Sequence, residues 1–252
     1  MNLLDFLRPK ISLKKGLMPK HIGLYLRDAH AQPQLKTKNI LQLIYAQARL
    51  NIPILSIYSL PQGINPAHLP SRIDDLIDLV KTLTQWKLIH TARIRVTIIG
   101  HWYDLPSRLV EPLKKLQEAT RHHDTFFLNL CVHYDGQAEI VDAASIIARQ
   151  VKLGRLDPEQ ITKETIKEAL STSYFVPPQL IITSGPHLSL HGFLLWDSAT
   201  SSIFFTKKGI IDFSPQDMLL ALEYYQSTRQ EQLPQSKPSS NSMLIPTREK
   251  HS

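Results

Sequence analysis

Hydrophobic positions fall into two kinds of run along the chain, and their alternation predicts the fold class. Apolar, β-branched runs of strand length stand at 21–26, 52–60, 92–100, 125–134, 178–185 and 201–206. Apolar residues recur at helical spacing in the segments 37–50, 70–90, 105–120, 136–154, 157–170 and 214–232. Strand–helix alternation with right-handed crossovers gives parallel sheets. We therefore predict an α/β fold, with a single-domain parallel six-stranded sheet flanked by helices.

Residues at the ends of these segments predict where helices begin and stop. Ser71 precedes Asp74 by three residues and is expected to cap the helix 70–90. Gly154 is placed to end the helix 136–154, because glycine readily adopts the backbone conformation of a C-terminal cap. Ser214, followed by a proline, is expected to cap the closing helix.

Composition divides the chain into three parts. Residues 1–18 form a basic, amphipathic arm, 19–230 the folded domain, and 231–252 a tail rich in Ser, Pro and charge that is expected to be disordered. The arm could rest on a lipid surface or be a solvated segment with apolar anchors. No apolar run is long enough to span a membrane, and the start lacks a signal peptide's apolar core. We expect a cytoplasmic protein in which the solvated arm is the favoured interpretation and peripheral membrane contact through the arm is the alternative.

Charge and cysteine content limit the kinds of partner and of cysteine chemistry that the chain can have. Lys and Arg number 29 against 22 Asp and Glu, and this net charge of +7 favours anionic partners. No helix-turn-helix, zinc-finger or RNA-recognition motif is present, so nucleic acid is not among the predicted partners. Cys131 is the single cysteine and lies in an apolar run, which predicts a buried, inert thiol and excludes an internal disulfide.

Several polar stretches could carry chemistry, although the GxSxG, GxxxxGK[ST] and GxGxxG motifs are all missing. "RHHD" at 121–124 offers metal ligands, but a solvent-facing turn is the favoured interpretation. "GHWYDLP" places His101 at a pocket rim, while capping of a helix by Asp104 explains it equally well. "SGPHLSLHG" follows the fifth strand, at the edge of a parallel sheet where ligands bind.

Seven segments, taken in order, carry a resemblance to a known family. They are "PKHIGLYL", "IPILSIYSL", "IRVTIIG", "HYDGQAEIVDAASIIARQV", "LGRLDPEQIT", "FLLWDSATSSIFFT" and "IDFSPQDMLLALEYY". The chain resembles the cis-prenyltransferases, the undecaprenyl diphosphate synthase family. That resemblance implies a parallel sheet with an apolar tunnel, a dimer, and transfer of prenyl groups to isopentenyl diphosphate with Mg²⁺ at the leaving diphosphate.

The chain departs from the family pattern where diphosphates are bound. The family's metal-binding Asp falls on Arg27 without a gap and on Asp28 with one extra residue. The two arginines that clamp isopentenyl diphosphate become Thr183 and Ser189. The resemblance therefore implies a degenerate member without a metal site. Its candidate catalytic residue is Asp28, and its candidate substrate-binding residues are Arg27, His30, Thr183, His187, Ser189 and His191.

Two functions follow from these departures. The first is a non-catalytic partner subunit, or a binder of polyprenyl lipid, in a homodimer or in a heterodimer with an active cis-prenyltransferase. Losing one charged phosphate contact removes on the order of 1.5 to 3 kcal/mol of binding, and several are lost here. The alternative is an active prenyltransferase or altered terpenoid enzyme. Its rebuilt site would contain Asp28, His30, His101, His187 and His191. Mg²⁺ is expected only on this alternative, and no other cofactor is implied.

Overall fold

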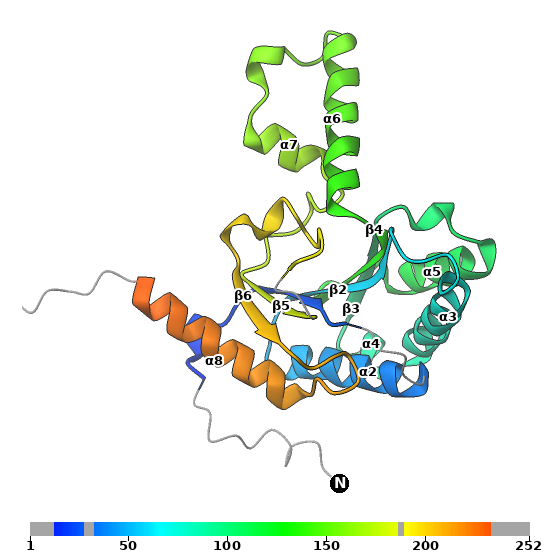
Figure 1. Ribbon diagram of the computed structural model, residues 1–252, viewed down its shortest axis with the longest axis vertical. Coiled ribbons are helices and arrows are strands. Elements are labelled where there is room, and N and C mark those ends of the chain that lie inside the picture. The colour runs from blue at the N-terminus through cyan, green and yellow to red at the C-terminus, as the bar shows by residue number, and fades with distance from the viewer. Residues whose placement is uncertain (1–12, 28–32, 186–188, 233–252) are drawn as a thin grey trace, which may run out of the picture.

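Six parallel strands form the centre of the protein, in the order β3-β4-β2-β1-β5-β6 (Figure 1). The computed structural model describes residues 13–27, 33–185 and 189–232. The strands are β1 (His21–Tyr25), β2 (Ile54–Pro61), β3 (Ile94–Ile99), β4 (Phe126–Tyr134), β5 (Leu180–Ser184) and β6 (Ser202–Thr206). The predicted parallel six-stranded sheet is confirmed.

Helices connect the strands. They are α2 (Pro33–Arg49), α3 (Leu69–Gln85), α4 (Lys87–Thr91), α5 (Ser107–Thr120), α6 (Gly136–Lys152), α7 (Lys163–Ala169) and α8 (Pro215–Gln232). Short 3-10 turns stand at η1 (Lys15–Leu17), η2 (Trp102–Asp104), η3 (Pro158–Gln160) and η4 (Asp197–Thr200). Among the described residues, no helix has both the length and the apolar content to cross a membrane.

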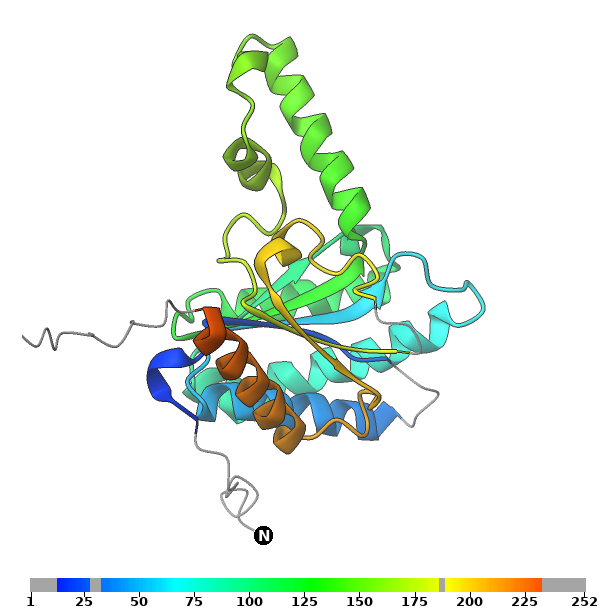
Figure 2. The same cartoon turned by 60° about the vertical axis from the view of Figure 1, so that its left-hand side comes forward.

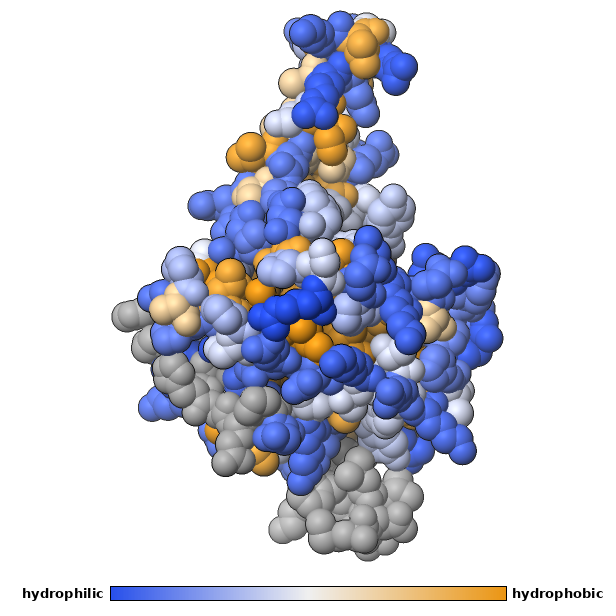
Figure 3. Space-filling model, turned by 90° about the vertical axis from the view of Figure 1, so that its right-hand side faces the viewer, coloured by the Kyte–Doolittle hydropathy of each residue, from blue (hydrophilic) through white to orange (hydrophobic). Residues whose placement is uncertain are grey.

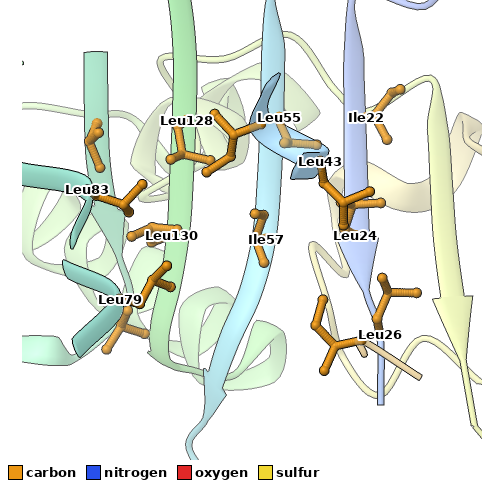
Figure 4. Close-up of a cluster of buried hydrophobic side chains, with 14 of the residues drawn as sticks. Ile22, Leu24, Leu26, Leu43, Leu55, Ile57, Leu79, Leu83, Leu128 and Leu130 are labelled. Carbon is orange, nitrogen blue, oxygen red and sulfur yellow. The ribbon is translucent and has the colours of Figure 1, made fainter. Parts of the chain in front are cut away.

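One face of the sheet packs against α2, α3, α5 and α8 and forms the main hydrophobic core. Figure 4 shows alternate residues of β1, β2 and β4 pointing toward Leu43 of α2 and toward Leu79 and Leu83 of α3. These alternate residues are apolar because successive strand side chains face opposite sides of a sheet. Leu83 and Leu43 are fully buried, so the helical spacing seen in the sequence is the spacing of core contacts.

The opposite face of the sheet carries a smaller core that is not made by long helices. Phe193 and Leu194, from the chain between β5 and β6, pack there with Tyr58, Cys131 and other residues of the strands. Cys131 is fully buried, and burial raises the pKa of its thiol well above the usual value, so the inert thiol is confirmed. The flanking helices thus cover mainly one face of the sheet.

Helices α6 and α7, with the chain that joins them, project from the body of the protein (Figures 1 and 2). We call residues 136–170 the α6–α7 arm. The helix α6 begins at Asp135, whose carboxylate accepts hydrogen bonds from two backbone amides of the first turn. It ends at Gly154, which has a φ of +65° and donates from its amide to Val151 O, so the predicted C-terminal cap is confirmed.

Other helix ends differ from their predictions. The helix α3 begins at Leu69, and the Ser71 hydroxyl donates to the carbonyl of His68, so capping by Ser71 is wrong. The reason is Pro70, which the first turn of a helix tolerates because the amide there needs no partner. The predicted helix 70–90 is divided at Trp86, whose backbone is extended.

Two further boundaries differ from their predictions, and one agrees. The segment 157–170 contains η3 and α7 rather than one helix, because Thr162 forms a capping box that starts α7 anew. Asp104 lies in η2 and does not cap α5, which starts after Pro106 without a side-chain cap. Ser214 caps α8 as predicted, exchanging hydrogen bonds with Asp217.

Both predicted terminal segments lie mostly outside the described residues. Residues 1–12 and 233–252 are not described, so the character of the arm and the tail stays a prediction. The last part of the N-terminal arm is attached to the body, because the backbone of Lys14 exchanges two 2.9 Å hydrogen bonds with the side chain of Gln226 in α8.

Candidate functional site

Arg27 follows β1 at the carboxyl edge of the sheet, and neighbouring elements hold its backbone. Its amide donates to the Ser184 hydroxyl at 2.7 Å, and its carbonyl accepts from the Ile210 amide at 3.0 Å. Gly209 packs against the same carbonyl, where a Cβ atom would lie only 2.7 Å away. The Arg27 side chain is exposed. Of the other predicted site residues, Asp28, His30 and His187 lie outside the described residues.

Thr183 in β5 and Ser189 in the following chain both bond to nearby groups of this segment. Thr183 is 1% exposed, and its hydroxyl donates to the Ser189 carbonyl at 3.2 Å. The Ser189 hydroxyl accepts from the His191 amide at 3.1 Å. His191 has a φ of +49°, a conformation uncommon outside glycine, and its side chain is exposed. The Thr183 and Ser189 hydroxyls are therefore used in bonds within the protein, whereas the His191 imidazole lies at the surface.

A cleft of about 400 Å³ opens at the ends of β1 and β2, and we call it the β1–β2 cleft. Arg27, Arg72 and His191 border it from three different elements. The Tyr25 ring lies 5.2 Å from the His191 ring and 5.0 Å from the Tyr58 ring. Figure 3 shows the side of the protein on the right of Figure 1, where hydrophobic side chains gather at the centre among hydrophilic ones.

Aromatic side chains fill the sheet face beneath this cleft. The Tyr58 and Phe193 rings stack with centroids 5.1 Å apart, and the Tyr58 hydroxyl donates to the Tyr134 carbonyl. Phe193 can approach β1 because Gly23 has no side chain; a Cβ there would lie 3.0 Å from the Phe193 ring. Burial raises the pKa of Tyr25 and Tyr58, so both hydroxyls stay protonated.

A cavity of about 70 Å³, lined by both apolar and polar side chains, lies between the sheet and helices α2 and α3. Its lining includes Leu24, Ile40, Ile57 and Leu76. At its rim, Lys36 pairs with Asp75 at 2.7 Å. The resemblance implies an apolar tunnel under the helices, and this cavity is the space that the described residues leave there.

The described residues near the end of β1 do not fit a Mg²⁺ ion. Mg²⁺ requires several oxygen ligands in octahedral geometry, usually including a carboxylate. The one carboxylate among the described residues of the β1–β2 cleft, Asp135, already accepts two backbone amides of α6, the Arg27 cation lies in the same cleft, and the hydroxyls of Thr183 and Ser184 have partners. Within residues 13–27, 33–185 and 189–232, no three His, Cys, Asp or Glu residues could hold a metal ion.

A second cleft, of about 440 Å³, lies between α6 and the ends of β3 and β4, and we call it the α6 cleft. In it, His101 Nε2 lies 2.6 Å from an Asp142 carboxylate oxygen, and Nδ1 lies 3.2 Å from the Gln62 amide nitrogen. His133 Nδ1 lies 3.2 Å from the His101 carbonyl oxygen. Of the two interpretations of "GHWYDLP", a pocket rim and a helix capped by Asp104, the structure agrees with the first: His101 lies at the rim of this cleft.

Tight backbone packing brings the α6 cleft and the β1–β2 cleft together. Gly100 has a φ of +105°, and a Cβ on it would lie 2.5 Å from the Val132 carbonyl oxygen. Gly136 approaches Gly192 so closely that a Cβ on it would lie 2.2 Å from the Gly192 carbonyl oxygen. Asp135 borders both clefts. His101 and His191 thus face different clefts, and they do not form one site.

Buried polar pairs attach the arm to the body. Glu139 accepts hydrogen bonds from the Tyr134 hydroxyl at 2.6 Å and from the Thr172 amide at 3.2 Å. Lys167 of α7 pairs with Asp197 at 2.7 Å, and the Asp197 side chain is 5% exposed. These contacts fix the base of the arm, since a buried charge without a partner is strongly unfavourable.

The turn at 121–124 has the solvent-facing character that was favoured for it. Arg121, His122 and Asp124 are exposed, and Arg93 pairs with Asp124 at 2.8 Å. His123 Nδ1 lies 2.9 Å from the Ile94 carbonyl oxygen, where it acts as a local backbone contact.

Side chains that the sequence did not single out complete both clefts. They are Tyr25, Tyr58, Arg72, Asp135, Asp142 and Arg149. One signal could have found some of them: in a parallel sheet the helix after a strand begins at the carboxyl edge, so the first turns of α6 had to face the strand ends. Arg72 gives no comparable local signal.

The fold and clefts define a class of parallel α/β proteins whose ligand site lies at the carboxyl edge of the sheet. Residues 24–232 match the family described as "Putative undecaprenyl diphosphate synthase". The chain therefore belongs to this family, the cis-prenyltransferases, as the resemblance predicted.

Individual relatives agree with this assignment. The tritrans,polycis-undecaprenyl-diphosphate synthase (geranylgeranyl-diphosphate specific) of Methanopyrus kandleri is 29% identical over 231 residues, covering 85% of this chain and 84% of that protein. The isoprenyl transferase of Streptococcus mutans is 29% identical over 235 residues, covering 86% and 94%. The crystal structure of lavandulyl diphosphate synthase from Lavandula x intermedia in complex with dimethylallyl diphosphate has a TM-score of 0.76. It is 24% identical, covers 84% of this chain and 96% of that one, and shares the fold.

Proposed function

We propose that this chain is a non-catalytic cis-prenyltransferase family protein that serves as the partner subunit of an active prenyltransferase. The observation that carries the proposal is the chemistry at the three positions where the family binds diphosphate and metal. Aligned without a gap, Arg27 takes the place of the family's metal-binding carboxylate, and Thr183 and Ser189, which take the place of its clamping arginines, bond to neighbouring groups. Stabilising a leaving diphosphate needs metal ions and cationic donors.

The small volume and mixed lining of the cavity under α2 and α3 favour a partner subunit over a polyprenyl-lipid binder. The cavity under α2 and α3 is about 70 Å³. An apolar cavity of about 150 Å³ holds one benzene molecule, and ligand sites are commonly about 300 to 1,000 Å³. A polyprenyl chain of many isoprene units needs far more space than this one cavity offers.

The α6–α7 arm supports the pairing that the proposal requires. Val141 is 63% exposed and Leu153 is 65% exposed, on a part of the protein that projects from the body. Figure 3 shows hydrophobic side chains breaking the hydrophilic surface along this projection. Exposed apolar side chains on a projecting element favour contact with a partner protein. A cytoplasmic location with peripheral membrane contact belongs to this proposal.

Mixing experiments test the partner role. The purified chain is added to an isoprenyl transferase from the same organism, with Mg²⁺, farnesyl diphosphate and labelled isopentenyl diphosphate. We expect the two chains to co-elute and the rate of elongation, or its product length, to change. Leu153→Asp on the arm should abolish the effect, while Leu220→Asp on α8, at a position 47% exposed, should leave it intact. No co-elution and no change in product would contradict the proposal.

One observation favours the second candidate, an altered terpenoid enzyme. The β1–β2 cleft, of about 400 Å³, is large enough for a small ligand and is bordered by Arg27, Arg72 and His191. The test is product formation by the chain alone with isoprenyl diphosphates. Loss of any such activity in Arg27→Ala, with activity retained in the matched exposed-arginine variant Arg155→Ala, would support this candidate.

A further inference from the structure

The α6 cleft has the size and the mixed lining of a small-molecule site. Its volume is about 440 Å³, and sites for small ligands commonly measure about 300 to 1,000 Å³. Such sites combine apolar or aromatic surface with a few polar groups that fix the orientation of the ligand. Arg27, Thr183 and Ser189, on which the proposed function depends, do not line this cleft. The α6 cleft therefore offers a separate place for a ligand.

A chain of three side chains orients the Asp142 carboxylate in this cleft. The Gln62 amide nitrogen lies 3.2 Å from His101 Nδ1 and donates to it, so the ring proton of His101 is on Nε2. From Nε2 this proton is donated to Asp142 Oδ2 at 2.6 Å. The other oxygen of Asp142, Oδ1, accepts from no donor in the described part of the chain, and the side chain is 52% exposed. Asp142 thus presents an oriented acceptor to an N–H donor in the cleft.

A cation stands at the outer end of the same wall. Arg149 is exposed and forms no ion pair with any residue that the structure describes. It lies seven residues beyond Asp142, about 10 Å along the helix and on the same side of it, so the two side chains do not pair with each other. An arginine fork fits the oxygens of a phosphate group. The wall therefore suits a ligand with a donor at one end and an anion at the other.

An aromatic side chain forms another side of the cleft. Tyr103 is 61% exposed, and its ring lies 5.7 Å from the His101 ring, centroid to centroid. Exposed aromatic rings bind the planar bases of nucleotides by stacking. Tyr103 thus favours a planar ring in the space beside Asp142.

We propose that the α6 cleft binds a nucleoside monophosphate whose base carries an exocyclic amino group, such as adenosine monophosphate (AMP). The amino group donates to Asp142 Oδ1, the base lies against Tyr103, and the phosphate contacts Arg149. Base, ribose and phosphate are joined in line, which matches the separation of the two charged side chains along α6. A base with a carbonyl oxygen in place of the amino group sets an acceptor against the carboxylate, which is unfavourable. The proposed function uses neither this cleft nor this ligand, so either one can fail without the other.

Three ligands that differ by one group test the proposal. Titration calorimetry on the full chain compares AMP with inosine monophosphate, whose base has the carbonyl oxygen, and with adenosine, which lacks the phosphate. We expect one AMP to bind per chain, and the other two to bind on the order of 10-fold more weakly, because each loses a hydrogen bond to a charged group. No binding of AMP up to about 1 mM, or equal binding of all three ligands, would overturn the proposal.

Substitutions in the wall assign each end of the ligand. Arg149→Ala should weaken the binding of AMP on the order of 10-fold and leave that of adenosine unchanged, which also shows that the variant is folded. Lys163→Ala removes an exposed cation of α7 outside the cleft and should change neither. Equal effects of Arg149→Ala and Lys163→Ala on AMP would contradict the phosphate contact.

Asp142→Asn tests the recognition of the base. The oxygen of the new amide can still accept from His101, and its nitrogen can donate to a carbonyl oxygen of the base. The preference for AMP over inosine monophosphate should therefore disappear or reverse. Tyr103→Ala should weaken both ligands on the order of 10-fold, while Tyr103→Phe should keep the affinity because it retains the ring. An unchanged preference in Asp142→Asn, or equal affinities in Tyr103→Ala and the native chain, would show that the base does not lie here.

Discussion

The two clefts at the carboxyl edge of the sheet differ in what their polar side chains face. Beside the β1–β2 cleft, Thr183 is buried and donates to the Ser189 carbonyl, so the loop satisfies itself. In the α6 cleft, His101 and Asp142 come from separate elements and meet in an open space. The comparison shows that, at one edge of the same sheet, polar side chains can bond locally in one cleft and remain open to a ligand in the other.

The largest expected effect concerns the base of the arm. In Lys167→Met, Asp197 would keep its charge without an ionic partner in a nearly inaccessible position. We expect a loss of about 3 to 5 kcal/mol in the free energy of unfolding, measured by urea denaturation. Lys163→Met, at an exposed position of the same helix, should change it by less than about 0.5 kcal/mol. Equal effects would show that the pair does not attach the arm.

A pH effect is expected at the start of β1, at the end of the strand opposite the β1–β2 cleft. Burial lowers the pKa of His21 to about 4, and its Nε2 lies 2.7 Å from the Ser56 hydroxyl. In the unfolded chain the pKa of histidine is about 6.5, so as the pH falls below that value the unfolded state gains a proton that the folded state does not. Stability should therefore fall between about pH 6.5 and 4, by on the order of 3 kcal/mol from this group.

The control for this effect is His21→Gln, which cannot take up a proton in that range. Urea denaturation at pH 7 and pH 4.5 compares the two proteins. The variant should lose less stability than the native chain between these two values of pH. An identical loss in both would assign the acid sensitivity to other groups.

The close contact between Gly136 and Gly192, which lies between the two clefts, is expected to have the next largest effect on stability. In Gly136→Ala, the new Cβ would lie 2.2 Å from the Gly192 carbonyl oxygen, so the backbone must shift. We expect a loss of about 1 to 3 kcal/mol, measured by urea denaturation. Gly63→Ala, where nothing lies within 4 Å, should change stability by less than about 0.5 kcal/mol. An unchanged stability in Gly136→Ala would show that the start of α6 can move away from Gly192 at little cost.

Much of the fold could be predicted from the sequence because hydrophobic spacing is local. The apolar composition of the runs that form β1 to β6 already indicated buried strands. The two ends of α6, at Asp135 and Gly154, depend on hydrogen bonds to backbone groups a few residues away. Ser71 failed as a cap because Pro70 let the helix begin two residues earlier. The cover on the second face of the sheet depends on Phe193 packing over Gly23, which no local pattern reveals.

The candidate site was less predictable. Arg27 and His191 border one cleft as their positions after β1 and β5 suggested. The burial of Thr183 depends on which way β5 presents its side chains in the register with Tyr25, which is a tertiary property. Asp142 and Arg149 come together with His101 only when α6 is placed against the strand ends.

Turnover by the chain alone tests the central claim, that its residues no longer support metal-dependent prenyl transfer. The purified chain is incubated with Mg²⁺, farnesyl diphosphate and labelled isopentenyl diphosphate, and extracted products are counted against a protein-free control. The account predicts no elongated product above that control. Elongation that requires Mg²⁺ and disappears in the presence of EDTA would contradict it.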